Sequence, residues 1–218
     1  MNNDELRKAR QAPFVKYGKT PRLYRDVTIT EKLDGTNSQL VFMNAPYGER
    51  HPDYVSSFLD EDGVPVFLYC GSRNRLITPG NGTDNYGFAG WAQENALDLF
   101  EALGVGRHYG EWYGLGIARG YDLPEKRWAL FNPHRYAGIN LPPRVETVPL
   151  VMQRNFGAID FQSVLADLQA SGSLASPGFM NPEGVIVRHS ASKAIYKLLI
   201  GDDGTNNKVK DPSPEEMV

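Results

Sequence analysis

The sequence has few of the features that mark secreted, membrane-bound or phosphate-loop proteins. Cys70 is the single cysteine among 218 residues, which excludes an intramolecular disulfide and leaves a cysteine zinc site short of ligands. No apolar run approaches the roughly 18 residues that cross a bilayer, and the N-terminal MNNDELRKAR lacks the apolar core of a signal peptide. Walker and Rossmann glycine patterns are missing, and the four histidines show no metal-ligand spacing. We therefore expect a soluble, cytoplasmic protein with no membrane partner.

Charge is spread unevenly along the chain, although 23 basic and 26 acidic residues give a net charge of only −3. Residues 1–25 hold seven lysines and arginines against two carboxylates, and this basic N-terminal segment either contacts a polyanion or forms a solvated face. Residues 201–218 are polar, with hardly any apolar side chain, which predicts a disordered tail.

Short strand-like runs alternate with connections rich in glycine and proline, which predicts one α+β domain over residues 1–200. We expect helices over residues 91–103, ending before Gly104, and over residues 161–170, with Asp160 as the cap and Gly172 beyond the end. The long polar connections 44–63 and 78–90 are candidates to line a substrate groove. The expected strands cover residues 27–32, 38–43, 64–70, 107–113, 127–131, 148–153, 184–189 and 194–200.

Residues 31–37 read EKLDGTN, so that Lys32 ends an expected strand and a turn follows at Asp34 and Gly35. A lysine held there can serve as a nucleophile if its surroundings favour the neutral amine. Taken alone, this string is more typical of an exposed hairpin turn. Four further segments follow it in order: SRNR at 72–75, GEWYG at 110–114, the strand that ends at Phe131, and EGVIV at 183–187 followed by YKL at 196–198.

Over about residues 24–200, this order of motifs resembles the covalent nucleotidyltransferases, which include polynucleotide ligases and mRNA-capping enzymes, and most of all the ATP-dependent RNA ligases. The resemblance implies a nucleotidyltransferase (adenylyltransferase) domain of antiparallel sheets flanked by helices around an ATP cleft. In that family a lysine, matched here by Lys32, attacks the α-phosphate of ATP and becomes lysyl-AMP. The AMP then passes to a 5′-phosphate end, and a 3′-hydroxyl displaces it. Asn37 favours RNA as the substrate, because DNA ligases usually have arginine nearby.

The resemblance also implies a nucleotide-binding role for several further side chains. Arg73 would contact the nucleotide or the end phosphate, and Glu111 would accept hydrogen bonds from the ribose hydroxyls. Phe131 would stack on adenine. The residues alone leave a surface arginine, an exposed strand carboxylate and a core phenylalanine open as alternatives. The expected nucleotide-binding set is completed by Glu31, Asn37, Arg188 and Lys197, with Arg188 standing where many relatives carry lysine.

Glu183 and Lys197 join Lys32 as the expected catalytic residues. A carboxylate such as Glu183 can bind the Mg²⁺ or Mn²⁺ that neutralises ATP phosphates. Lys197 would stabilise the pentavalent transition state as a fixed cation. The family's last motif often reads Lys-x-Lys, but Ile195 occupies the first of these positions, so either Lys193 replaces it or that contact is missing.

A polar ending near residue 218 predicts a minimal ligase without a C-terminal OB domain, which argues against a capping enzyme. Two alternatives stay open: a minimal ATP-dependent DNA ligase, and a nucleotide- or RNA-binding module that has lost catalysis. Covalent AMP on Lys32 would exclude the binding module. We expect a monomer that acts in RNA repair, with an end-healing enzyme in trans to supply the 5′-phosphate and 3′-hydroxyl.

Overall fold

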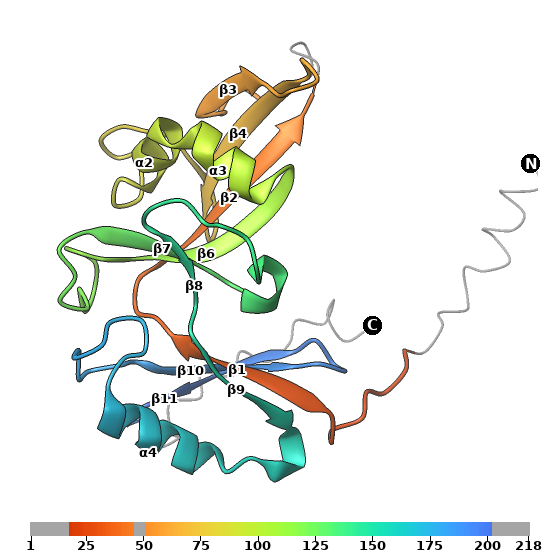
Figure 1. Cartoon of the computed structure of the whole chain (residues 1–218), viewed down its shortest axis with the longest axis vertical. Coiled ribbons are helices and arrows are strands. Elements are labelled where there is room, and N and C mark those ends of the chain that lie inside the picture. The colour runs from red at the N-terminus through yellow and green to blue at the C-terminus, as the bar shows by residue number, and fades with distance from the viewer. Residues whose placement is uncertain (1–17, 46–50, 202–218) are drawn as a thin grey trace, which may run out of the picture.

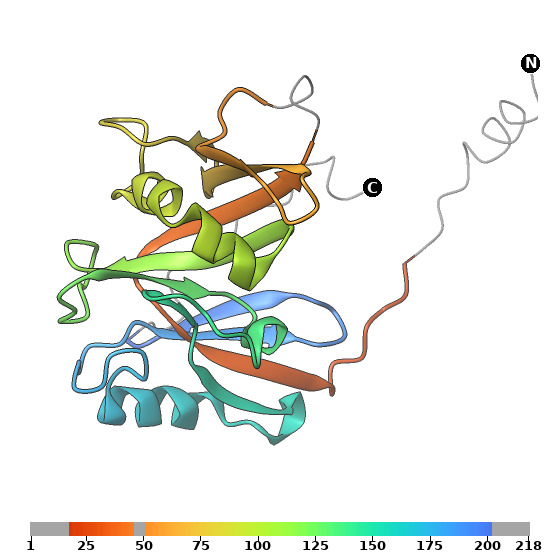
Figure 2. The ribbon, with the colours of Figure 1, turned by 45° about the horizontal axis from the view of Figure 1, so that its top comes forward.

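The computed structural model describes residues 18–45 and 51–201, which form two stacked β-sheets with helices on their outer faces (Figure 1). The turned view separates the layers, with the α-helix at residues 161–171 below the lower sheet and the α-helices at residues 88–94 and 96–103 on the upper sheet (Figure 2). Most of the basic segment 1–25 and nearly all of the tail 201–218 lie outside the described residues. The architecture is the expected α+β arrangement of antiparallel sheets flanked by helices.

The first sheet has four antiparallel strands in the order β11-β10-β1-β9. Apolar side chains alternate along β1, so Val27 and Ile29 lie on the face that packs against α4, while Lys32 lies on the other face. Asp160 caps α4, because its Oδ1 accepts hydrogen bonds from two backbone N–H groups of the first turn. The elements of this half are β1 (Asp26–Lys32), β9 (Leu150–Asn155), η3 (Phe156–Ala158), α4 (Phe161–Ser171), β10 (Gly184–His189) and β11 (Ile195–Leu199).

The second sheet runs in the order β3-β4-β2-β6-β7-β8, with β5 paired to β4. Its outer face carries α2 and α3 over the largest apolar core, in which the Trp91 ring packs against both Trp112 and Trp128. The elements are β2 (Thr36–Asn44), β3 (Ser56–Leu59), β4 (Pro65–Ser72), β5 (Leu76–Ile77), α2 (Phe88–Glu94), α3 (Ala96–Leu103), β6 (Gly106–Gly114), β7 (Lys126–Leu130), η2 (Pro133–Tyr136) and β8 (Val145–Thr147).

Residues 33–35 join the two sheets, because β1 ends at Lys32 in one sheet and β2 begins at Thr36 in the other. A third apolar cluster packs between the sheets beside this connection and includes Leu33, Tyr113 and Ala129. The short connection therefore fixes Lys32 at the boundary between the two layers.

Gly35 is required at this boundary by close packing. A Cβ added there would lie 2.4 Å from the Trp112 carbonyl oxygen and 2.8 Å from Tyr113 Cβ. Gly35→Ala is expected to destabilise the fold by about 1–3 kcal/mol through overpacking, with about 2–4 °C of Tm for each kcal/mol in a domain of this size. Thermal unfolding measures this shift. Gly18→Ala is the matched control, because an added Cβ at Gly18 meets nothing within 4 Å. Equal Tm values for the two variants would contradict the packing argument.

The eight expected strands are confirmed to within two residues at each end. The short strands β3, β5 and β8 were not predicted. The helix expected over 91–103 is confirmed at its end, Leu103 before Gly104, but it is not one helix, because helical structure begins at Phe88 and breaks at Asn95. Asn95 leaves the helical conformation, with φ −111° and ψ 20°, and its Nδ2 donates to the Trp91 carbonyl oxygen at 2.7 Å. The helix expected over 161–170 is confirmed as α4.

Candidate active site

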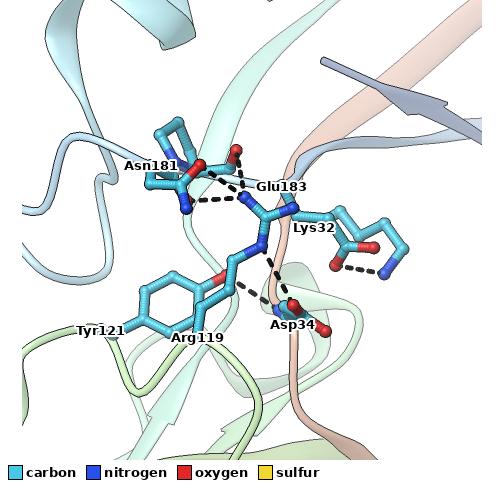
Figure 3. Close-up of polar contacts among 7 residues, drawn as sticks. Lys32, Asp34, Arg119, Tyr121, Asn181 and Glu183 are labelled. Atoms are coloured by element: carbon cyan, nitrogen blue, oxygen red, sulfur yellow. Dashed lines mark hydrogen bonds and ion pairs between the residues drawn. The ribbon is translucent and has the colours of Figure 1, made fainter. Parts of the chain in front are cut away.

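Lys32 and Glu183 form the centre of the candidate site. The antiparallel register pairs Lys32, the last residue of β1, with Gly184, the first residue of β10, so that Glu183 comes to lie beside the lysine. Lys32 Nζ donates to Glu183 Oε2 at 2.5 Å, and the two side chains are only 22% and 15% exposed (Figure 3). A charge-assisted hydrogen bond in this partly buried position holds both groups in a defined place.

Glu111 approaches this pair from the second sheet. The register pairs Glu111 with Asn37 on one side and with Ala129 on the other, and Ala129 belongs to the cluster between the sheets. Burial raises the pKa of Glu111 to about 7, and the nearby Glu183 adds to this rise. The charges of Lys32 and Arg73 and a hydrogen bond from the Gly35 N–H oppose it. Five expected site residues, Lys32, Asn37, Arg73, Glu111 and Glu183, are therefore brought together from both sheets.

This raised pKa makes the stability of the protein depend on the charge of Glu111. Below pH 4.5 the carboxyl is protonated in the folded and unfolded states alike, whereas above pH 7 the folded state carries a poorly solvated charge. Relative to Glu111→Gln, the wild type is expected to lose unfolding free energy as the pH rises from 4.5 to 7. The upper limit is about 3 kcal/mol, from about 1.4 kcal/mol per pKa unit. Urea unfolding of both proteins at pH 4.5, 6 and 8 measures the difference, and parallel curves would contradict it.

Lys197 and Arg188 lie on the same face of the first sheet as Lys32. Ile186 pairs with Thr30 on one side and with Lys197 on the other, and alternation along β1 puts Thr30 on the Lys32 face. Arg188 occupies the next position on that face, and both cationic side chains are exposed. The sheet therefore presents a row of positive charge that leads away from the Lys32–Glu183 pair.

Two expected contributors lie elsewhere. Glu31 points to the opposite face of β1, where it is 1% exposed and accepts hydrogen bonds from Ser173 Oγ at 2.6 Å and from the backbone N–H groups of Leu174 and Ala175. Burial raises the pKa of this carboxyl. The structure does not bring Glu31 to the Lys32 group. Lys193 lies in the turn between β10 and β11 with φ 62°, outside the strand that carries Lys197.

Phe131 and Arg73 follow the ends of two strands of the second sheet. Phe131 comes directly after β7 and packs, partly buried, against the cluster between the sheets. Arg73 comes directly after β4 and is exposed, with its charge close enough to lower the pKa of Glu111. Arg73 therefore lies near the Lys32 group, whereas Phe131 lies beside the apolar cluster between the sheets.

No motif in the sequence singles out two residues that contact the connection after Lys32. Arg119 Nε donates to Asp34 Oδ2 at 3.0 Å, and the Asp34 N–H donates to the Tyr121 hydroxyl oxygen at 2.8 Å (Figure 3). The contacts join residues 85 and 87 positions apart in the chain. The only local signal is a glycine-rich stretch, GLGIARGY, between two expected strands.

Metal and membrane features are sparse in the described parts of the chain. In residues 18–45 and 51–201, no group of three or more His, Cys, Asp or Glu side chains is arranged to hold a metal ion. Glu183 and the neighbouring Glu111 are two carboxylates, fewer than such a group requires. None of the helices in these ranges has the length and apolar character needed to cross a lipid bilayer.

Comparisons with known proteins identify the family and the fold of the chain. A search of curated protein sequences gives no match to the chain. Among solved structures, two variants of an RNA ligase from Naegleria gruberi, each with ATP and manganese, share the fold. They are 16% and 14% identical, with TM-scores of 0.50 and 0.51, and the alignments cover 80% and 82% of this chain. The same alignments cover 48% and 51% of the Naegleria chains, so this chain spans about half of their length. The family model for RNA ligases matches residues 25–199, and the chain therefore belongs to the RNA ligase family.

Proposed function

We propose that the protein is an ATP-dependent RNA ligase in which Lys32 carries AMP as a covalent intermediate. The AMP then moves to the 5′-phosphate of an RNA end, and a 3′-hydroxyl displaces it to seal the strand. The observation that carries the proposal is the Lys32 Nζ–Glu183 Oε2 contact of 2.5 Å at the boundary between the sheets. It supplies a nucleophile and a proton acceptor in one place, within a chain of the RNA ligase family.

The first step is a displacement at the α-phosphorus of ATP. Glu183 accepts a proton from Lys32, and the free amine attacks. A bond forms between Lys32 Nζ and the phosphorus, the bond from phosphorus to the bridging oxygen breaks, and pyrophosphate leaves with the electron pair. Lys197 and Arg73 stabilise the negative charge that accumulates on the phosphoryl oxygens.

The side chains around Lys32 fit a nucleotide triphosphate. Cationic groups on both sheets suit the phosphates, and Phe131 offers a partly buried ring at the edge of the inter-sheet cluster. Glu111, on the face that looks toward the first sheet, is placed to accept hydrogen bonds from ribose hydroxyls once it is ionised.

Glu183 is the side chain that we propose to hold a divalent metal. Mg²⁺ and Mn²⁺ commonly use one or two carboxylates together with phosphate oxygens and water, so a single carboxylate suffices. When bound, the ion neutralises charge on the departing pyrophosphate. The Naegleria structures hold ATP and manganese, which supports the same pair here.

The test is the intact mass of the protein after incubation with ATP and Mg²⁺ or Mn²⁺, followed by peptide mapping. A gain of one AMP on Lys32 is expected, and release of that AMP on adding RNA with a 5′-phosphate and a 3′-hydroxyl, with joined product, completes the assignment. The same experiment with a nicked DNA duplex measures the preference for RNA. A protein that gains no AMP from ATP with either metal would overturn the proposal.

A further inference from the structure

The loop between β6 and β7 has an uncommon backbone that sets the position of Arg119. Ala118, Tyr121 and Asp122 have φ values of 44°, 56° and 53°, a region that residues other than glycine seldom adopt. The loop is anchored by two side chains that are almost completely buried, Ile117 and Tyr121. Conformations of this kind persist where the surroundings determine them, and they gather at functional sites.

From this position, Arg119 contacts two segments that lie far apart in the sequence. Its Nε donates to Asp34 Oδ2 at 3.0 Å. Its Nη1 donates to the Asn181 carbonyl oxygen at 2.9 Å, to Asn181 Oδ1 at 2.8 Å and to the Pro182 carbonyl oxygen at 3.2 Å. Figure 3 shows the guanidinium between the connection that follows β1 and the segment that leads into β10.

These two segments carry the two members of the central pair. Asp34 lies two residues after Lys32, and Pro182 lies one residue before Glu183. We infer that Arg119 is a positioning residue, which holds Lys32 and Glu183 in register by tying together the backbones beside them. The assignment of a catalytic consequence to this tie rests on the proposed function.

Tyr121, from the same loop, also binds the connection that follows β1. Its hydroxyl oxygen accepts from the Asp34 N–H at 2.8 Å, and its carbonyl oxygen accepts from Ser176 Oγ at 2.7 Å. The loop therefore holds both the backbone and the carboxylate of Asp34. Only the carboxylate depends on Arg119, so a change at Arg119 loosens one contact of the connection and leaves the other in place.

An arginine suits this task better than a lysine. The planar guanidinium directs N–H donors to a carboxylate and to carbonyl oxygens at once, whereas an ammonium is a point charge on a flexible chain. Arg119→Lys should therefore keep the ion pair with Asp34 and lose part of the link to residues 181 and 182. Its effect is expected to lie between those of the wild type and Arg119→Gln.

The first measurement does not require ATP. Competitive acetylation with acetic anhydride, read by peptide mass, reports how readily each lysine reacts. In Arg119→Gln we expect Lys32 to be labelled at least threefold faster relative to the exposed Lys19, because its bond with Glu183 is no longer held. Unchanged labelling of Lys32 would overturn the inference, whether or not the protein forms an AMP adduct.

The second measurement follows adduct formation over a range of ATP concentrations. Misplacement of a reacting group by about 1 Å reduces rates by about 10²-fold. We therefore expect Arg119→Gln to lower the maximal rate by 10- to 100-fold, with the half-saturating ATP concentration changed less than threefold. Asp34→Asn should resemble it, and the double variant should be no slower than the slower single variant if the two residues act through one contact.

Arg144→Gln is the matched control. Arg144 also joins a carboxylate and a backbone carbonyl, Glu125 at 3.7 Å and Lys126 at 2.8 Å, and its side chain is 33% exposed against 31% for Arg119. We expect it to lower Tm at least as much as Arg119→Gln does while leaving the adduct rate and Lys32 labelling unchanged. If both variants slow the adduct in proportion to their loss of Tm, Arg119 serves only the fold. Failure of the wild type to form any adduct would instead overturn the proposed function.

Discussion

A Lys32→Arg protein is expected to keep its unmodified mass after incubation with ATP and Mg²⁺, while the wild type gains one AMP. Arginine cannot lose its proton under these conditions, so it has no lone pair with which to attack phosphorus. It retains the positive charge beside Glu183, which otherwise would lose its 2.5 Å partner. The loss of the adduct should therefore be complete while Tm changes by only a few degrees.

Lys126→Arg is the control for this experiment. Lys126 also donates from Nζ to a fixed oxygen, the Tyr86 carbonyl at 2.7 Å, but it lies at the start of β7 rather than beside Glu183. The control should gain AMP at the wild-type rate. An adduct of the same mass on folded Lys32→Arg would show that another residue is the nucleophile, and peptide mapping would locate it.

The central strands were predictable because their own sequences carry the signal. Strands such as β1 and β10 alternate apolar side chains toward α4, and this period of two survives in the sequence. The strands β3, β5 and β8 have only two to four residues, too few for a period to be visible. Neighbouring strands determine their pairing: β8 lies parallel to β7, and β5 pairs with β4 in the described part of the chain. Contacts with the rest of the fold, rather than their own sequences, therefore determine where such short strands form.

The residues of the candidate site that lie in the ordered motifs could be predicted from the sequence. Lys32, Glu111 and Glu183 come together although they are spread over about 150 residues, because strand register sets their positions. Glu31 shows the limit of that approach. Adjacent residues of a strand point to opposite faces, so Glu31 and Lys32 cannot both project from β1 into the space between the sheets. The alternation of side chains along this strand could be read from the sequence. It was overlooked because Glu31 and Lys32 were assigned to the site together, as parts of one motif.

Arg119 could not be found in this way. Its partners at Asp34 and Asn181 lie 85 and 62 positions away, and it reaches them from a loop with no periodic pattern. The backbone of that loop adopts positive φ at Ala118, Tyr121 and Asp122, for which the residue types give little warning. Such contacts become visible only when both sheets are in place.

Glu183→Gln is expected to lower the rate of AMP transfer to Lys32 by about 10²-fold or more, the range in which a positioned proton acceptor contributes. Glutamine keeps the size of the side chain and one oxygen that can accept from Lys32 Nζ, but it neither takes up a proton readily nor presents an ionised oxygen to a metal. The adduct should therefore still form, slowly, and on the same lysine. Glu125→Gln is the control, because Glu125 is also paired with arginines, Arg127 at 3.4 Å and Arg144 at 3.7 Å.

The two roles of Glu183 respond to different conditions. If proton acceptance dominates, raising the pH from 7 to 9 should narrow the difference in rate between Glu183→Gln and the wild type, because hydroxide can then take the place of the missing proton acceptor. If metal binding dominates, raising the Mn²⁺ concentration should narrow the gap, because mass action offsets the weaker site. Rates from intact mass at several pH values and metal concentrations separate the two. A Glu183→Gln protein as fast as the Glu125→Gln control under all conditions would remove Glu183 from the chemistry, and the 2.5 Å contact would then only hold β1 beside β10.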